Sequence, residues 1–147
     1  MTPDVNLLVA ASRPDHPHFA PASAWLARAL AAAGTGATFT LMPMVIASFL
    51  RLVSSPKIFK SPASIDAAVA FVDSLLKQPG VHLATLGPEW PTLRRLCVDK
   101  QLTGNDLPDA WLASATLQLG EHLATFDAGF KKLLSRAQVT VLAAAAA

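Results

Sequence analysis

Hydrophobic and polar positions alternate along this chain with two different periods. Apolar runs too short for a helix of typical length predict strands at 5–11, 37–41, 81–86, 122–126 and 138–142. Apolar side chains that recur every three or four residues predict helices at 20–33, 43–54, 64–77, 91–100, 107–119 and 128–134. Strands that alternate with helices indicate an α/β fold, a three-layer α/β/α domain whose central sheet has about five strands, mostly parallel.

Local signals support these boundaries. Pro43 suits the opening turn of a helix, Ser64 is a predicted N-cap, and Gly120 suits the end of the helix at 107–119. With 147 residues the chain is long enough for one domain with its own core, and we expect that domain to cover residues 1–142. The alanine run at 143–147 has no strand pattern, and we expect a disordered tail or a remnant of cloning there.

One uncharged stretch, residues 29–50, is long enough to span a membrane. Gly34, Gly36 and Pro43 interrupt it, so we interpret it as a helix end, a turn, a buried strand and the start of a second helix. The single cysteine, Cys97, excludes an internal disulfide and a cysteine-based zinc site. A chain without disulfides fits a reducing compartment, and we expect a cytoplasmic location.

The net charge of +2 is too small to indicate nucleic-acid binding by itself, but the charges are unevenly distributed. No acidic residue lies between Asp15 and Asp66, whereas this interval contains the basic residues Arg28, Arg51, Lys57 and Lys60. A positive face of this kind would attract phosphate groups. The same pattern suits an ordinary solvated surface, so charge alone leaves both interpretations open.

Several aspartates lie at strand ends and helix starts, where α/β folds place their ligands. Asp127 follows the strand at 122–126, Asp4 stands at the start of the first predicted strand, and Asp109 is the third residue of its helix if Asp106 is the N-cap. Taken singly, each has a structural explanation as a cap or as a partner of a helix dipole. Asp4 is the informative one, because a carboxylate beside an apolar strand is costly without a partner, and a divalent cation is one such partner.

Four segments together resemble the PIN-domain toxins of the VapC type. DVNLLVAA (4–11), followed by HPH and AWL within 16–26, is similar to the N-terminal half of that family, and FLRLVSSPKIF (49–59) is similar to its second helix and following loop. GNDLPDAWLA (104–113) and LATFDAGF (123–130) are similar to its two C-terminal acidic motifs. The resemblance covers about residues 4–134 in the family's order and spacing. Each motif alone is weak, and the four together are specific.

The resemblance implies a PIN-like α/β/α domain that acts as a Mg²⁺- or Mn²⁺-dependent endoribonuclease. Such a protein is the toxin of a toxin–antitoxin pair, is held inactive by a VapB-type antitoxin and forms a homodimer. The resemblance also implies that Asp4, Asp109 and Asp127 bind the metal in one acidic pocket and that Asn6 and Thr125 line it. Carboxylate oxygens are the ligands that Mg²⁺ and Mn²⁺ prefer, and the metal would activate a water for in-line attack on the RNA phosphodiester.

One position departs from the family. Many PIN domains have a glutamate in the second helix about one residue before Phe-Leu-Arg, and here Ser48 occupies that place. Three carboxylates fit one metal ion better than a two-metal site. Asp106 would be a further metal ligand, although the N-cap role explains it as well. Arg51, aligned with the family's Phe-Leu-Arg, is the candidate for contacting RNA phosphate, with a salt bridge as the alternative.

Two other functions stay open. One, motivated by the missing glutamate, is a catalytically weakened PIN-like module that binds RNA or a protein partner through the basic interval 28–60, and growth arrest on expression without an antitoxin would count against it. The other is an unrelated helical interaction protein in which all three aspartates are helix caps. This last protein differs from a nuclease in a measurable way, because caps alone should bind no divalent ion.

The remaining residues of chemical interest have simpler explanations. His16 and His18 lie two apart in a proline-flanked loop, and no third nitrogen or sulfur ligand can be identified, so a loop or surface role is favoured over a metal pair. His82 is expected to pack on its strand, and Cys97 is expected to be buried as a small apolar residue. The three tryptophans are expected in the core or in an interface; they are Trp25, Trp90 and Trp111.

Overall fold

The computed structural model describes residues 1–144, which form five strands, six α-helices and one 3₁₀ helix. In chain order these are β1 (Thr2–Pro3), α1 (Val5–Ser12), α2 (Phe19–Ala33), β2 (Phe39–Leu41), α3 (Pro43–Val53), α4 (Ile65–Leu76), β3 (Val81–Leu83), α5 (Trp90–Lys100), α6 (Asp106–Gln118), β4 (Leu123–Thr125), the 3₁₀ helix η1 (Ala128–Lys132) and β5 (Val139–Val141). Of the tail expected at 143–147, residues 145–147 lie outside the described part of the chain.

The strands pair in parallel. β4 lies between β1 and β5, with Leu123 opposite both Thr2 and Val139, while β2 pairs with β3. The two sheets adjoin at β1 and β2, where the Thr40 amide donates to the Met1 carbonyl (2.9 Å) and the Thr2 hydroxyl donates to the Thr40 carbonyl (2.7 Å). The spatial order is therefore β3, β2, β1, β4, β5, and the carboxyl ends of all five strands face the same edge.

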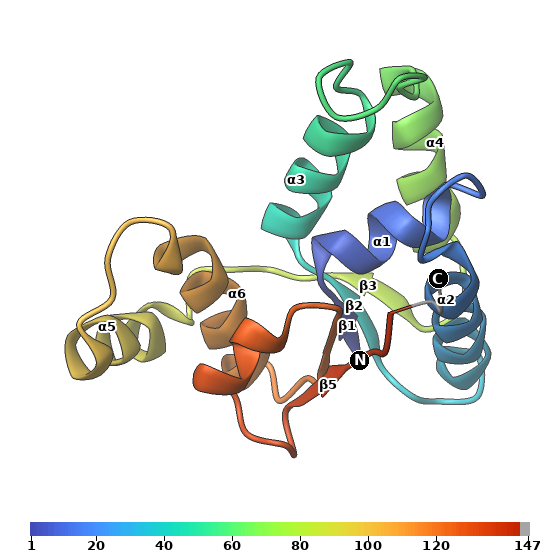
Figure 1. Ribbon diagram of the computed structural model, residues 1–147. Helices are drawn as coiled ribbons and strands as arrows, with labels where there is room; N and C mark the ends of the chain where they lie inside the picture. Colours follow the sequence, from blue (N-terminus) through green and yellow to red (C-terminus); the bar gives the residue numbers. More distant parts are fainter. Residues whose placement is uncertain (145–147) are drawn as a thin grey trace.

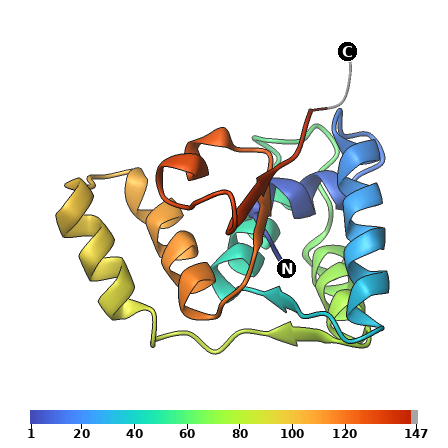
Figure 2. The same ribbon diagram turned by 90° about the horizontal axis from the view of Figure 1, so that it is seen from below.

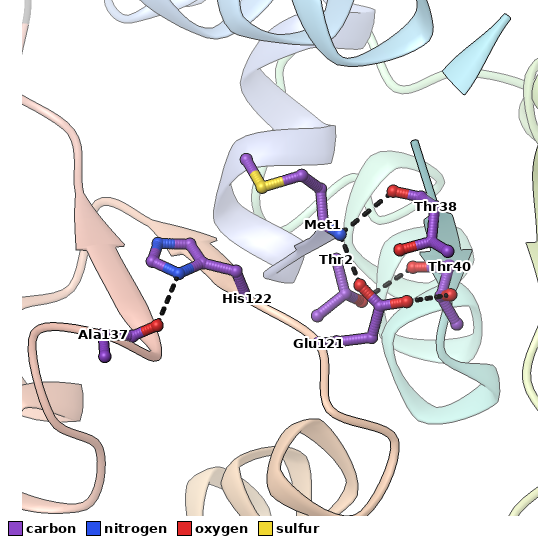
Figure 3. Close-up of polar contacts among 7 residues, drawn as sticks. All are labelled: Met1, Thr2, Thr38, Thr40, Glu121, His122 and Ala137. Carbon is purple, nitrogen blue, oxygen red and sulfur yellow. Dashed lines mark hydrogen bonds and ion pairs between the residues drawn. The ribbon is translucent and has the colours of Figure 1, made fainter. Parts of the chain in front are cut away.

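A polar junction connects the segments at the opposite, amino-terminal edge (Figure 3). The Glu121 carboxylate accepts hydrogen bonds from the Met1 ammonium group and from the Thr40 hydroxyl, the latter at 2.8 Å. The Met1 ammonium group also donates to the Thr38 carbonyl at 3.0 Å. These contacts tie the start of β1, the strand β2 and the segment before β4 together. The junction therefore holds the sheet at the edge opposite the carboxyl ends of the strands.

Helices pack around this sheet. α1 contacts α2 and α3, and α3 contacts α4, whereas α5 and α6 pack against each other. Figures 1 and 2 show α2 and α4 toward one end of the molecule, α5 and α6 toward the opposite end, and α1 between them. The three bulkiest fully buried side chains come from β2, α3 and η1; they are Phe39, Phe49 and Phe130. The α/β architecture with a parallel sheet between helices is thus confirmed.

The first predicted strand is wrong, because residues 5–12 form the helix α1 and β1 comprises only Thr2 and Pro3. Asp4 begins this helix as its N-cap, since its carboxylate accepts a hydrogen bond from the Val5 amide. The run is apolar on every side because α1 lies between α2, α3 and β4, where most of its residues are buried. A helix buried all round has the same continuous apolar pattern as a buried strand, so periodicity cannot distinguish the two.

The other elements were predicted with only small errors. Ser64 is the N-cap of α4 as expected, accepting a hydrogen bond from the Ala67 amide. The N-cap of α6 is Asn105 and not Asp106, which is the first helical residue and instead accepts a hydrogen bond from the Thr103 amide at 3.3 Å. The helix expected at 128–134 is the shorter 3₁₀ helix η1. Within residues 1–144 no helix is long and apolar enough to cross a membrane.

Candidate active site

Asp4 is a carboxylate held inside the protein at the junction of β1 and α1. Its side chain is nearly inaccessible, with the residue only 6% exposed. One carboxylate oxygen accepts a hydrogen bond from the Val5 amide and the other from the Thr125 hydroxyl, each at 2.7 Å. Burial raises the pKa of Asp4, the two hydrogen bonds lower it, and the charge of Asp127 raises it further, so that the net pKa is above the ordinary value.

The Thr125 hydroxyl organises the polar groups around Asp4. Thr125 is the last residue of β4 and is fully buried. Besides donating to Asp4, its oxygen accepts a hydrogen bond from the Asp127 amide (2.9 Å) and a longer one from the Asn6 side chain (3.4 Å). The Asn6 side-chain oxygen in turn accepts from the Phe126 amide at 3.4 Å. The start of α1 and the end of β4 are therefore linked through three polar side chains, those of Asp4, Asn6 and Thr125.

Asp127 and Asp109 bring two more carboxylates toward Asp4. Asp127 is exposed and caps η1, where its carboxylate accepts a hydrogen bond from the Gly129 amide at 2.7 Å. Asp109, in the first turn of α6, is partly buried. Its pKa is raised by desolvation first and then by the negative charges of Asp4, Asp127 and Asp106. Aspartates from three separate elements thus share one electrostatic field.

Within residues 1–144, no ion pair joins a cationic side chain to this cluster of three aspartates, Asp4, Asp109 and Asp127. In the described chain the ion pairs join Met1 to Glu121 and Arg13 to Asp15, so none includes a member of the cluster. Neighbouring negative charges that raise the pKa of Asp4 and Asp109, with no ion-pair partner to offset them, favour the binding of a cation. Their oxygen atoms are hard donors, which fit Mg²⁺ or Mn²⁺ better than a soft metal.

The spacing of the cluster limits how it would hold an ion. Across residues 1–144 no three histidine, cysteine, aspartate or glutamate side chains gather closely enough to hold one metal ion directly. Mg²⁺ usually keeps several waters and is bound through only one or two carboxylates, so the remaining carboxylate can act through water. The donor chemistry and the uncompensated charge of the cluster therefore fit such an ion, while the spacing does not supply a closed protein cage.

A large apolar cavity opens beside the cluster between α3, α5 and α6. It has a volume of about 780 Å³, and Asp4 and Asp109 contribute to its wall. Ser48 also lines it, so the residue in place of the family's glutamate lies in the same cavity as two of the aspartates. Arg51 follows three residues later on α3 and is exposed. Asp106 is also exposed and lines a neighbouring cavity of about 530 Å³ that reaches Asp109.

The apolar wall of the 780 Å³ cavity was not anticipated from the sequence. Trp90 is 61% exposed and Trp111 is 39% exposed, and both line this cavity. Of the three tryptophans, which were expected in the core or in an interface, Trp25 is the one buried in the core. Cys97 was expected to be buried but is half-buried in the same wall. No residue of α5, which is described in full, is buried. The sequence offers little indication of this exposed wall, because α5 has the amphipathic pattern of an ordinary surface helix.

Only some of the histidines have the structural roles that the sequence favours. The His16 Nδ1 atom accepts a hydrogen bond from the His18 amide at 3.0 Å, which staples the loop between α1 and α2. His82 is exposed on β3 and is not packed as expected. Neither His16 nor His18 takes part in a metal cluster among the described residues.

Comparisons with known proteins identify the family. The sequence matches the family model of the PIN domain over residues 1–134. It is 39% identical over 136 residues to Ribonuclease VapC31 of Mycobacterium tuberculosis, with 90% of this chain and 92% of that protein covered. It is 37% identical over 134 residues to Ribonuclease VapC25 of the same organism, again covering 90% and 92%.

A solved structure agrees at the level of the fold. The crystal structure of VapBC2 from Rickettsia felis bound to a DNA fragment from their promoter matches with a TM-score of 0.61 and 18% sequence identity, over 94% of each chain. With a family match over most of the chain and relatives above 30% identity, the aspartate cluster lies in a known type of fold. The chain belongs to the PIN-domain family, in its VapC branch.

Proposed function

We propose that this protein is a Mg²⁺- or Mn²⁺-dependent endoribonuclease, the toxin of a toxin–antitoxin pair, and that the aspartate cluster is its catalytic centre. The observation that carries this proposal is the convergence of three carboxylates from α1, α6 and η1 with no cationic partner in the described chain. The names of the relatives, ribonucleases VapC31 and VapC25, support RNA as the substrate.

Each residue of the cluster has a distinct task in this proposal. Asp4 and Asp109 are held inside the site and bind the ion, and Asp127 adds a third negative charge from the exposed side. The divalent ion, when bound, supplies an activated water and neutralises charge on the scissile phosphate. Thr125 keeps the Asp4 carboxylate oriented through its 2.7 Å hydrogen bond, and Asn6 fixes Thr125 and the backbone at Phe126.

Two side chains of α3 extend this proposal toward the substrate. Ser48 lines the cavity beside Asp4 and leaves the site with a smaller acidic set than many PIN domains have. We therefore expect one tightly held metal ion. Asp106 is a candidate for an additional, water-mediated ligand. Arg51, exposed on the same helix and outside any ion pair of the described chain, is the candidate for binding an RNA phosphate.

The proposed partners follow from the family. A VapB-type antitoxin would hold the enzyme inactive, in line with the solved complex of VapB and VapC chains to which this fold is similar. We also propose a homodimer, and a cytoplasmic site of action, where the RNA substrate and the antitoxin are present.

Cleavage of RNA by the purified chain tests the proposal. We expect cleavage that requires added Mg²⁺ or Mn²⁺, stops with EDTA, and falls at least about 100-fold in Asp109→Asn, because one of the acids that hold the ion loses its charge. Asp73→Asn is the matched control, since Asp73 is an exposed aspartate on α4 outside the cluster. Equal cleavage by Asp109→Asn and the parent would show that the assigned centre is wrong.

A second function, a catalytically weakened binding module, is favoured only by Ser48. It predicts metal-independent RNA binding without cleavage, and no growth arrest when the chain is expressed without its antitoxin. Growth arrest that disappears with Asp127→Asn would exclude it.

A further inference from the structure

A second cavity lies beside the start of α1. It has a volume of about 410 Å³ and is walled by α1, by the loop that precedes α2, by the end of α3 and the α3–α4 loop, and by the residue after β4. Val5 lines both this cavity and the 780 Å³ cavity, so both lie beside the helix start that Asp4 caps. Asn6, which is bonded to Thr125, belongs to its wall as well. We call it the aromatic cavity; its lining is Val5, Asn6, Val9, His16, His18, Leu52, Ile58, Phe59 and Phe126.

The rings of the aromatic cavity are held in place by contacts with one another and with Arg13. The His18 ring lies 5.2 Å from the Phe126 ring, centroid to centroid, and 5.6 Å from the His16 ring. The Arg13 guanidinium group lies 3.9 Å from the centroid of Phe59, and it is itself fixed by hydrogen bonds to the Asp15 carboxylate and the Ser61 carbonyl. A preformed aromatic wall loses little conformational entropy when a flat ligand enters.

Two polar groups in the wall are available for a ligand's hydrogen bonds. Because His16 Nδ1 accepts a hydrogen bond from the His18 amide, the neutral ring carries its hydrogen on Nε2. Burial and the nearby charge of His18 lower the pKa of His16, which keeps that neutral form at pH 7. The Asn6 amide has a second hydrogen besides the one directed at Thr125. Both are donors, and ring nitrogens and carbonyl oxygens of nucleobases are acceptors.

Three basic residues adjoin lining residues of the aromatic cavity in the sequence. Lys57 and Lys60 flank Ile58 and Phe59 in the α3–α4 loop, and Arg51 precedes Leu52 on α3. All three basic residues are exposed, and no ion pair in the described chain includes any of them. Aromatic surfaces for stacking combined with cations for the backbone are what proteins use to bind single-stranded nucleic acid.

We propose that the aromatic cavity binds one unpaired base of the RNA substrate, next to the phosphodiester that the aspartate cluster cleaves. This inference rests on the proposed function. The base stacks on the wall formed by Phe59, Phe126 and His18, while His16 and Asn6 select it by hydrogen bonds. The cavity volume is within the range of small-ligand sites, about 300–1,000 Å³, and the exposed basic residues next to its lining residues in the sequence favour a polyanion over a protein segment. The cavity is therefore a determinant of which base neighbours the cleaved bond.

Binding of RNA without cleavage tests this base site separately from catalysis. Full-length protein in EDTA is titrated against fluorescent single-stranded oligoribonucleotides, and a single abasic position is moved along the strand. For the parent we expect one position at which loss of the base weakens binding at least about 5-fold, the low end of one stacked base. In Phe59→Leu and His16→Ala that penalty should shrink toward 1-fold, because the residue and the base act as a pair. His82→Ala, an exposed histidine on β3, should keep it.

Two readouts keep the outcome decisive. The melting temperature of each variant checks its fold, and His16→Ala removes a group outside the α3–α4 loop in case Phe59→Leu unsettles that loop. With added Mn²⁺, the base preferred beside the cut should change in His16→Ala if the parent cleaves RNA at all.

The base site is wrong if no abasic position stands out in the parent, or if the same penalty remains in both variants. If the antitoxin and not RNA loses affinity for Phe59→Leu, the cavity is a protein interface and the proposal is overturned. A parent that binds through one base but never cleaves would refute the nuclease assignment and leave the base site standing.

Discussion

At the scale of single residues, hydrogen bonding and charge act on the clustered aspartates in different ways. Asp4 is buried and retains two hydrogen bonds that favour its charged form, whereas the pKa of Asp109 is raised by desolvation and three neighbouring carboxylates. Asp4 therefore depends on the hydroxyl of Thr125, and Asp109 depends on the net charge of its surroundings. Each dependence leads to a separate prediction.

Replacing Thr125 by valine should weaken metal binding and cleavage without leaving a cavity in the core. Valine keeps the shape of threonine but removes the donor to Asp4, so the pKa of Asp4 should rise further. We expect about 10- to 100-fold weaker Mn²⁺ binding or cleavage, the usual cost of losing a group that orients a metal ligand. The loss should be greater at pH 6 than at pH 8, because more of Asp4 is then protonated.

A matched control exists for this variant. Thr116→Val also removes a fully buried hydroxyl, but that hydroxyl donates to the Leu112 carbonyl inside α6. Cleavage and Mn²⁺ titration of both variants separate the two roles. Equal losses in both would mean that Thr125 matters only for packing.

Replacing Asp109 by asparagine should stabilise the metal-free protein at neutral pH. Because its folded pKa is raised, this carboxyl contributes stability below the ordinary aspartate pKa of about 3.9, and that stability is lost as the pH rises through the folded pKa. Asparagine removes this repulsion. The free energy of unfolding should rise by no more than about 1 kcal/mol, because the side chain is partly exposed and solvent screens its charge.

Urea unfolding in EDTA at pH 7 and pH 4 measures this effect. The advantage of Asp109→Asn over the parent should be present at pH 7 and smaller at pH 4. A variant less stable than the parent at pH 7 would mean that Asp109 makes a stabilising contact that outweighs the repulsion.

At the scale of elements, one close contact fixes where the α4–β3 turn meets α2. Gly80 has a φ of +78°, and a Cβ added there would lie 2.2 Å from the Ala33 carbonyl oxygen at the end of α2. Gly80→Ala should therefore cost at least about 1–3 kcal/mol, from backbone strain plus the clash.

Gly120→Ala separates these two contributions. Gly120 has a similar φ of +64° but nothing within 4 Å of an added Cβ, so this variant should show the backbone cost alone. Thermal or urea unfolding of both gives the comparison. If Gly80→Ala is no less stable than Gly120→Ala, the turn and α2 are free to move apart.

At the scale of the whole molecule, the proposed metal site would couple ion binding to the stability of the fold. The clustered aspartates stand at the starts of α1, α6 and η1, so an ion bound there would hold these three elements together. Mn²⁺ at about 100 times its dissociation constant should add about 2.7 kcal/mol to the free energy of unfolding.

A thermal scan with and without Mn²⁺ measures this coupling. We expect the melting temperature of the parent to rise with Mn²⁺ concentration and that of Asp109→Asn to rise much less, while Asp73→Asn behaves like the parent. An equal rise in all three proteins would place the bound ion elsewhere.

The sequence by itself determined the alternation of strands and helices, the Ser64 cap and the family, because turn residues, capping residues and four ordered motifs are local signals. It did not determine that residues 5–12 are helical, since an element buried on all sides loses the periodicity that separates helix from strand. It also could not reveal the aromatic cavity, whose rings come from three distant segments. Only the tertiary structure decided which of these residues face one another, because packing and desolvation act between segments that are far apart in the chain.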